Sequence, residues 1–407
     1  MLHSTNFFRP QIRSRSYFRF SASQHVYKPK QCDGGKLYYE GDVPILSLES
    51  DDPFKAGMAH GYLCGDAINR LSKRFDLVLH TIGKQPKADQ LPKTLDVLRR
   101  SIPVRYLSEI EGLVKGYNLW AQEQHGWQAP KKITVDDALL FHLMPDSMHF
   151  QAGAFERKLP PAEKLQSAVA CSAIIERDPQ KGFVFARNMD WPSFGLSGAY
   201  SLVIHRKHTH GQHDTVEVGV PGFVGTLTGM NNQGLSVAMN VCSGTTREIR
   251  GMPASFYNRA CLEQCRTVDE VKAFARYSSP LGAYHLTVAD QEKAQSIHFY
   301  QGPEEGHLIR RWQEGQPLVT LNCRYNPNPS CAMHHSRERQ ALLDDFFQHR
   351  SGRSLEETLS LPFVNNWITT HRVVMEPQTG RFRVAFDNAF AGKAPLHDVS
   401  TQRLFQS

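Results

Sequence analysis

The chain has 407 residues and a formal net charge of +7 at neutral pH. Much of this charge lies at the N-terminus, where the following basic residues precede the first acidic residue of the chain: Arg9, Arg13, Arg15, Arg19, Lys28 and Lys30. The rest of the chain is close to neutral, which excludes the basic surface that binds a nucleic-acid backbone. No apolar run approaches the roughly eighteen residues of a membrane-spanning helix, so no transmembrane segment is predicted.

Residues 1–35 are predicted to form a basic, disordered arm. The arm contains Arg and Ser but almost no acid, which is also typical of a mitochondrial transit peptide, and it has no apolar stretch of the kind found in secretory signals. The eight cysteines of the chain are too few and too irregularly spaced for a disulfide scaffold, which favours a reducing compartment. We therefore expect a cytoplasmic protein, or a mitochondrial one if the source is eukaryotic.

The pattern between residues 36 and 170 is mainly helical. Asp52-Pro53 is a typical helix start, and apolar residues and glycines then recur at three- and four-residue steps from Phe54 to Val78. The same periodicity runs from Pro103 to Tyr117, and the residues Thr134–Asp137 resemble a capping box. We expect this segment to form a helical unit.

A β-hairpin is predicted where the helical pattern ends. The runs Val169–Ile175 and Phe183–Ala186 are rich in β-branched and aromatic residues, and the Asp-Pro-Gln-Lys-Gly segment between them supplies the turn. Antiparallel pairing across this turn brings the start of the first strand to the end of the second. Cys171 is therefore predicted to lie beside Arg187 and Asp190.

The rest of the chain is predicted to form mostly short strands, interrupted by helices near Pro253–Tyr277 and Ser336–Phe347. Strands are expected at Tyr200–Ile204, Thr215–Val220, Val224–Thr228, Leu235–Asn240, Tyr284–Ala289, Ser296–Tyr300 and Leu318–Asn322, with a hairpin at Val373–Phe386. This order of helices and strands indicates an α+β fold in which helices pack on stacked sheets.

The hairpin sequence also carries a family resemblance. Cys-Ser-Ala-Ile from Cys171, a turn containing glycine, and Arg-Asn-Met-Asp from Arg187 resemble the start of the catalytic chain in acid ceramidase and N-acylethanolamine-hydrolysing acid amidase. The pattern is also similar to choloylglycine hydrolases and to the autoproteolytic acyltransferases of penicillin biosynthesis, peptidase family C45. All of these are N-terminal nucleophile (Ntn) hydrolases. The stretches Phe54–Gly61, Gly229–Leu235 and Ser336–Arg339 agree best with the acyltransferase-like branch.

The resemblance implies a four-layer αββα sandwich and an amide hydrolase or acyltransferase activity. It also implies that residues 36–170 are a pro-segment, the α-chain, which attack of the Cys171 thiol on the Ala170 carbonyl severs from a catalytic β-chain, residues 171–407. The freed α-amine is then a base attached to the nucleophile, and Arg187 supplies positive charge. The expected partners are a small N-acyl amide substrate and the two chains of one precursor.

Further site residues follow from the resemblance. Asp190 is expected to orient the new α-amine, as a carboxylate orients a catalytic imidazole. Asn322 matches the position whose amide donates to the oxyanion, although Leu321 replaces the usual Thr beside it. Either Arg337 or Arg339 is expected to complete the charge network, because two residues this close on a helix point in different directions.

For the other candidate residues, the sequence allows both a role in the site and a structural role. Asn231 matches a family position near the oxyanion or is a hairpin-turn residue, and Asn240 is a weaker candidate for the same role. The aromatic side chains of Trp191, Phe194 and Phe223 either line an acyl pocket or belong to the core.

Competing interpretations of the chemistry remain open. A papain-like pair with a histidine such as His371 as base is one alternative, although the papain-type sequence around the cysteine is absent. Without the cysteine, Arg187 and Asp190 would read as a surface ion pair. An uncleaved family member acting as a binding protein is another alternative. Neither Cys261 and Cys265 nor the histidines have metal-ligand spacing, and phosphate-binding glycine loops are missing, so no metal or cofactor is implied.

Overall fold

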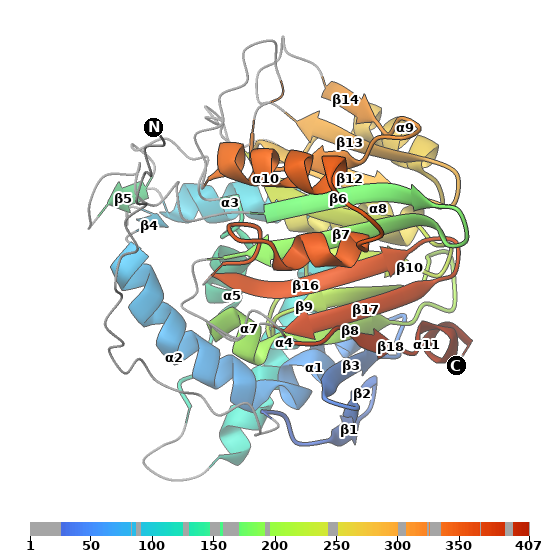
Figure 1. The fold of residues 1–407 in the computed structure, drawn as a ribbon. Helices are drawn as coiled ribbons and strands as arrows, with labels where there is room; N and C mark the ends of the chain where they lie inside the picture. The colour runs from blue at the N-terminus through green and yellow to red at the C-terminus, as the bar shows by residue number, and fades with distance from the viewer. Residues whose placement is uncertain are drawn as a thin grey trace, which may run out of the picture.

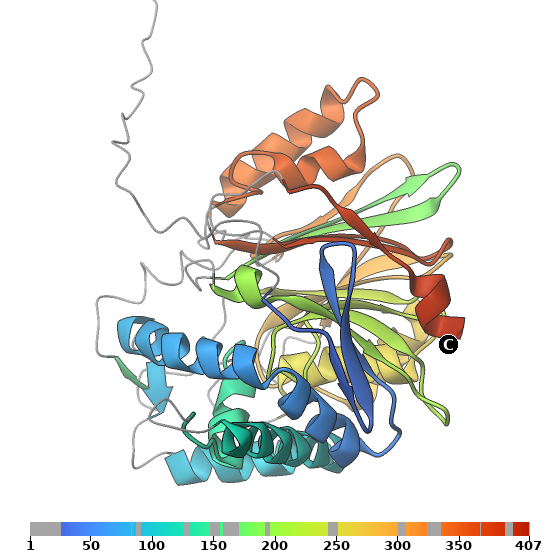
Figure 2. The same ribbon diagram turned by 90° about the horizontal axis from the view of Figure 1, so that it is seen from below.

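The computed structural model describes residues 26–82, 84–86, 91–124, 130–146, 155–157, 171–191, 196–242, 251–299, 307–323, 325, 335–366, 368–386 and 394–406. Two β-sheets stack face to face, and helices cover the outer face of each sheet (Figures 1 and 2). The four-layer αββα sandwich predicted from the sequence is therefore confirmed. Among the described residues, no helix combines the length and apolar character that crossing a bilayer requires.

The smaller sheet is antiparallel throughout and contains the predicted hairpin. Its strands, in spatial order, are β15 (Leu318–Thr320), β6 (Cys171–Asp178), β7 (Gly182–Asp190), β16 (Thr369–Glu376), β17 (Arg381–Phe386) and β18 (His397–Val399). The outer face of this sheet is covered by α10 (Ser336–Gln348) and the 3-10 helix η2 (Leu355–Ser360), as Figure 2 shows.

The larger sheet has ten strands. Their spatial order is β1 (Lys30–Cys32), β2 (Gly35–Glu40), β3 (Val43–Leu48), β8 (Leu202–Arg206), β9 (Thr215–Gly219), β10 (Thr228–Asn231), β11 (Ser236–Val241), β12 (Tyr284–Ala289), β13 (Ala294–Phe299) and β14 (His307–Arg311). All pairs are antiparallel except β3 and β8, which run parallel. A separate pair, β4 (Lys84–Pro86) with β5 (Phe155–Arg157), lies outside both sheets.

Helices of the N-terminal segment and of the later chain cover the outer face of the larger sheet (Figure 2). They are α1 (Pro53–Leu63), α2 (Gly65–Ile82), α3 (Leu91–Ser101), α4 (Val104–Glu123), α5 (Val135–His142), α8 (Ala254–Gln264) and α9 (Val268–Tyr277). The short helix α7 (Leu196–Tyr200) contacts α2 and β16 of the smaller sheet. The short helix α11 (Thr401–Gln406) follows β18.

The prediction of a disordered arm up to residue 35 is wrong for residues 26–35. Tyr27 is buried and its hydroxyl donates to the carbonyl of Tyr200, and β1 follows it. The predicted helical unit also begins with two strands, because β2 and β3 join the larger sheet. All six residues of β3 are buried, and a short apolar run of this kind has no periodicity that distinguishes a strand from a helix.

Two further predicted elements differ from the structure, and one strand was not predicted. The long helix predicted from Phe54 is divided at Cys64 into α1 and α2. The predicted strand Val224–Thr228 is mainly a loop, since β10 begins only at Thr228, and β14 was not expected. The loop forms because side chains, rather than a neighbouring strand, bind its backbone: the Val224 N–H donates to His142 Nε2 at 2.7 Å.

The two helices α1 and α4 cross at very short range. A Cβ atom added at Gly57 or Gly61 of α1 would lie 2.0 Å from a carbonyl oxygen of α4. Likewise, a Cβ added at Gly112 or Gly116 of α4 would lie 2.0 or 2.1 Å from a carbonyl oxygen of α1. Backbone therefore packs directly on backbone, and the small-residue spacing seen in the sequence serves a crossing within one molecule.

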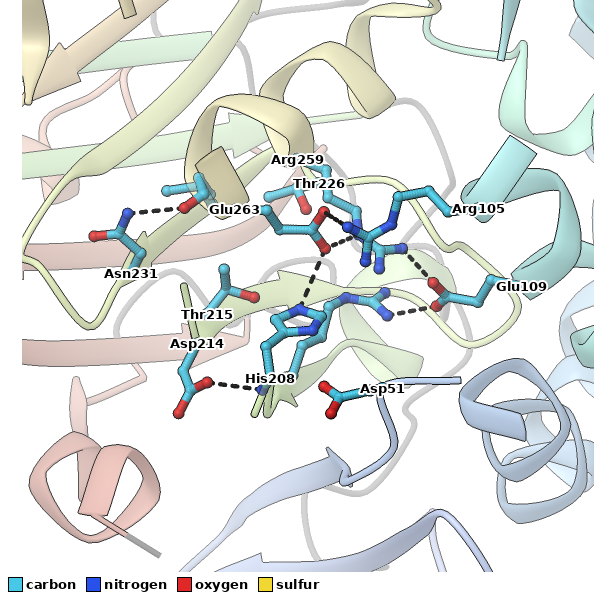
Figure 3. A network of polar contacts seen from close by, with 12 residues as sticks. Asp51, Arg105, Glu109, His208, Asp214, Thr215, Thr226, Asn231, Arg259 and Glu263 are labelled. Carbon is cyan, nitrogen blue, oxygen red and sulfur yellow. Dashed lines mark hydrogen bonds and ion pairs between the residues drawn. The ribbon is translucent and has the colours of Figure 1, made fainter. Parts of the chain in front are cut away.

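A buried ion network joins α4 to the larger sheet and to α8. Figure 3 shows Glu109 of α4 beside Arg259 and Glu263 of α8. Glu109 accepts from Arg206 of β8 at 2.5 Å and from Arg259 at 2.7 Å. Arg206 also binds Glu217 at 2.9 Å, and Arg259 binds Glu263 at 2.8 Å. Because all five side chains are buried, removal of one partner leaves an uncompensated charge, which typically costs about 3–5 kcal/mol.

Two neutral histidines also bind the N-terminal segment to the rest of the fold. His60 of α1 accepts the Gly222 N–H at Nε2 (3.0 Å), and His142 of α5 accepts the Val224 N–H in the same way. An imidazole nitrogen accepts a hydrogen bond only when it carries no proton. Burial lowers the pKa of His60 to about 3 and that of His142 to about 4, so both rings are neutral at neutral pH. The N-terminal segment is therefore an integral part of the fold.

Candidate active site

Cys171 is the first residue of β6 and is almost fully buried. It pairs with Met189 of β7, and Ala173 pairs with Arg187. Residues directly opposite each other, and residues two apart along a strand, share one face of a sheet. Cys171 and Arg187 therefore lie on the same face, and Ala173 belongs to the core between the two sheets. The predicted hairpin thus brings the thiol and the guanidinium together.

Arg187 crosses from the smaller sheet to the larger one. Its side chain is fully buried and donates to the carbonyls of Asn188 (2.8 Å) and Met239 (2.5 Å) and to the Asn240 Oδ1 atom (3.3 Å). A longer contact of 3.4 Å reaches the Thr228 hydroxyl. These oxygens carry no formal charge, so the contacts that hold the guanidinium do not neutralise it. The alternative of a surface ion pair is wrong, because both Arg187 and Asp190 are buried.

Asn322 and Arg339 hold the backbone of Cys171. The Cys171 N–H donates to Asn322 Oδ1 at 2.7 Å, and the Cys171 carbonyl accepts from Arg339 Nη1, also at 2.7 Å. Arg339 Nη2 donates to the same Asn322 oxygen at 3.0 Å. Arg339 is buried whereas Arg337 is exposed, which decides between the two candidate arginines. Burial lowers the pKa of Arg339, and the nearby Asp190 and Cys171 act in the opposite direction.

The amide of Asn322 is oriented differently from the prediction. Its oxygen faces two donors, and its Nδ2 atom donates to the Val241 carbonyl at 2.6 Å. In this arrangement Asn322 fixes the nitrogen of Cys171.

The neighbouring Cys323 is disulfide-bonded, which the cysteine count did not predict.

Asp190 is fully buried at the end of β7. Its Oδ1 atom accepts from the Thr369 hydroxyl at 2.6 Å, and its Oδ2 atom accepts from Asn366 Nδ2 at 2.8 Å. Burial raises the pKa of Asp190 to about 6, although these two donors and the charges of Arg339 and Arg187 lower it. Sequence reasoning missed Asn366 and Thr369, since both come from a distant segment without a local motif.

The structure favours the turn interpretation of Asn231. Its Nδ2 atom donates to the carbonyls of Leu262 and Cys265, both at 2.8 Å, and its Oδ1 atom accepts from the N–H groups of Gln233 and Leu235. Figure 3 shows it beside α8. With two donors and two acceptors engaged, the side chain has no capacity left for an oxyanion.

Of Asn231 and Asn240, the structure brings the weaker candidate, Asn240, to the site. Its Oδ1 atom accepts from Arg187, and its Nδ2 atom donates to the Thr320 carbonyl at 2.9 Å. It therefore links the larger sheet to two strands of the smaller one.

The structure places the described aromatic residues that were predicted to line a pocket in the core. Phe223 is buried and stacks on His142 of α5 with ring centroids 5.0 Å apart, so it belongs to the core on the outer side of the larger sheet. Trp191 is half-buried and packs against the core between the larger sheet and its helices. Phe194 and the predicted cleavage residue Ala170 lie outside the described residues.

His371 does not form a papain-like pair with the thiol. It lies on β16 opposite Met189, so β7 separates it from Cys171. Two strand spacings amount to about 10 Å, which is beyond hydrogen-bond reach. Burial and the Arg187 charge hold the pKa of His371 well below its usual value, and its Nε2 atom contacts the Thr228 hydroxyl at 3.4 Å.

Residues 177–314 match the family model of acyl-coenzyme A:6-aminopenicillanic acid acyl-transferase. The resemblance to this Ntn acyltransferase family is confirmed. The matched region includes Arg187 and Asp190, starts after Cys171 and ends before Asn322. No curated protein gives a significant sequence match.

Several solved structures are similar to this chain at low sequence identity. An N-acylethanolamine-hydrolyzing acid amidase ortholog from Caenorhabditis elegans shares 19% identity with a TM-score of 0.41, covering 51% of this chain and 93% of its own. Penicillin V acylase from Agrobacterium tumefaciens shares 15% identity with a TM-score of 0.40, covering 58% and 88%. A variant of the conjugated bile acid hydrolase from Clostridium perfringens shares 14% identity with a TM-score of 0.41, covering 58% and 94%.

Proposed function

We propose that the protein is a self-processing Ntn hydrolase that cleaves a non-peptide N-acyl amide through a thioester on Cys171. The observation that carries the proposal is the set of contacts at Cys171. Asn322 binds its nitrogen, Arg339 binds its carbonyl oxygen, and the thiol shares a sheet face with Arg187. Because the backbone nitrogen of Cys171 is already positioned by a hydrogen bond, it suits a mechanism in which that nitrogen becomes the base.

Maturation begins with attack of the Cys171 sulfur on the Ala170 carbonyl carbon. A C–S bond forms and the C–N bond breaks, so the acyl group moves from nitrogen to sulfur, and the nitrogen takes the thiol proton. Water then hydrolyses the thioester and leaves a free α-amine. The amine retains Asn322 Oδ1 as a hydrogen-bond acceptor at the position that the amide N–H occupies now. Cleavage leaves the two chains associated, because β2, β3, Glu109 and the two histidines anchor the N-terminal segment.

Catalysis then repeats the same chemistry on a substrate. The α-amine accepts the thiol proton, the sulfur attacks the amide carbon, and the departing amine takes the proton from the α-ammonium. Arg187 stabilises the thiolate, and Asp190 stabilises the α-ammonium electrostatically. Water or a second amine then removes the acyl group from sulfur, which gives hydrolysis or acyl transfer.

Intact mass spectrometry of the purified protein tests the proposal. Wild-type protein is expected to contain two chains, one of which begins at Cys171, and Cys171→Ala is expected to remain a single chain. The matched control is Cys261→Ala, which removes a buried cysteine of α8 and should still cleave. A full-length wild-type protein that turns over amides would contradict a self-made base. A full-length protein that binds amides without turnover would favour the binding-protein alternative.

An apolar acyl group is the proposed substrate class. The resemblance to an acyltransferase family supports it. In a series of N-acyl amides, kcat/KM is expected to rise about fourfold per methylene until the pocket is full, because each buried methylene contributes about 0.8 kcal/mol. A preference for acetyl amides would exclude this substrate class and leave a small-amide hydrolase.

A further inference from the structure

Thr320 carries a buried hydroxyl near Cys171. It is the last residue of β15 and is fully buried. Its hydroxyl has no hydrogen-bond partner among the residues that the structure describes. A buried hydroxyl without a partner carries a desolvation penalty, and native proteins retain few such groups. A group of this kind is expected where function, rather than stability, selects the residue.

The sheet register places this hydroxyl close to the thiol. Thr320 pairs with Ala173 of β6, and Ala173 pairs with Arg187 of β7. The three residues form one row on the face toward the larger sheet. Cys171 lies on the same face of β6, two residues from Ala173, so it is the diagonal neighbour of Thr320. Diagonal neighbours on adjacent antiparallel strands are about 7–8 Å apart between Cα atoms.

The residue between the hydroxyl and the thiol is small. On this face Ala173 contributes only a methyl group beside Thr320. An acyl carbon bonded to the Cys171 sulfur carries its oxygen two covalent bonds beyond the sulfur. That oxygen, directed along the sheet toward Ala173, approaches the Thr320 hydroxyl.

The side-chain amides of Asn322 and Asn240 donate to backbone carbonyls. Asn322 Nδ2 donates to the Val241 carbonyl, and Asn240 Nδ2 donates to the carbonyl of Thr320 itself. The second bond anchors the backbone of Thr320 to the larger sheet, which fixes the position of its side chain. The hydroxyl of Thr320 is thus a donor on an anchored strand that has no partner within the described ranges of the chain.

We propose that Thr320 is a catalytic residue that donates a hydrogen bond to the oxyanion. When the Cys171 sulfur attacks the acyl carbon, the C–S bond forms and the carbonyl π electrons move to the oxygen. The Thr320 hydroxyl donates to that oxygen until the C–N bond breaks and the carbonyl reforms. This inference rests on the proposed amide chemistry at Cys171, and it adds a residue that neither the family motif nor the sequence analysis included.

The variant Thr320→Val tests the inference, because valine has nearly the same shape and lacks the hydroxyl. Loss of one oxyanion donor is expected to lower kcat by about a hundredfold or more with little change in KM. The same variant is expected to unfold at a temperature equal to or higher than wild type, since it removes an unpartnered polar group. Thr320→Ser keeps the hydroxyl and should retain kcat within a few fold. Thr287→Val, on β12, is the matched control and should leave kcat unchanged.

Each kcat value is divided by the fraction of chains cleaved at Cys171, measured by mass spectrometry, so that slow maturation is not mistaken for slow catalysis. Thr320→Val with wild-type kcat would overturn the inference while leaving the proposed function intact. A clear loss of stability in Thr320→Val would also overturn it, because the hydroxyl would then have a structural partner. If wild-type protein neither cleaves itself nor turns over amides, the proposed function fails and this inference fails with it.

Discussion

Replacement of Gly61 by alanine should separate α1 from α4. A Cβ atom at this position would lie 2.0 Å from the carbonyl oxygen of Leu113 and 2.7 Å from the nitrogen of Tyr117. Ordinary contacts of this type are at least about 3.4 Å, so the helix axes must move apart by more than 1 Å. Both obstacles are backbone atoms, which have no rotamer that relieves the contact.

The expected magnitude comes from two opposing terms. Overpacking of a tight interior typically costs about 1–3 kcal/mol and sometimes more, and here it also disrupts the facing contacts of Gly112 and Gly116. Alanine is a better helix former than glycine by about 1 kcal/mol, which offsets part of this loss. We expect Gly61→Ala to lower the free energy of unfolding by about 2 kcal/mol or more.

Urea unfolding followed by circular dichroism measures this change. Lys115→Ala is a suitable control, because Lys115 is exposed on α4 and its replacement should change stability by less than about 0.5 kcal/mol. A Gly61→Ala protein as stable as wild type would show that the helices do not cross backbone to backbone, and the reasoning above would be refuted.

Three further predictions concern charge and pH. The pKa of Asp190 is raised to about 6, so kcat/KM should fall as the pH drops below this value and the carboxylate is protonated; Asp190→Asn should show a low rate without that acidic limb. The pKa values of His60 and His142 in the folded protein are lowered to about 3 and 4, below the ordinary 6.5. The unfolded chain therefore binds protons at a higher pH than the folded protein does. The free energy of unfolding should fall as the pH drops from 6.5 toward 4. His142→Gln should reduce this slope, and an unchanged slope would contradict the assignment of a neutral ring. Arg339→Lys should slow self-cleavage strongly, because lysine cannot reproduce four hydrogen bonds from two nitrogens, whereas Arg337→Lys should cleave like wild type.

The part of the site that sequence reasoning predicted is the part with local determinants. Cys171 and Arg187 meet because a single hairpin joins their strands, and a turn with recognisable chemistry sets the register of that hairpin. The family motif supplied Asn322 and Arg339, which come from distant segments. Spacing alone left Arg339 and Arg337 undecided, because the side of a helix that faces a sheet depends on packing.

The missed features depend on long-range contacts. Asn366 and Thr369 reach Asp190 from another strand and loop, and no local pattern marks either residue as a donor. Asn231 matched a motif, yet it lies beside the C-terminal end of α8, where its amide donates to backbone carbonyls. The strand β3 was assigned to a helical segment because its burial depends on β8, which is remote in sequence.

The parallel pairing of β3 with β8 makes a strand of the N-terminal segment the direct neighbour of a strand from the later chain. A catalytic chain produced from Cys171 onward would present β8 without its neighbour, and a bare strand edge is a template for intermolecular association. Such a fragment is expected to collect in inclusion bodies rather than to mature. Under the proposed self-cleavage, we therefore expect the N-terminal segment to be folded against β8 before the bond that precedes Cys171 breaks, and to act as a folding template for the rest of the chain.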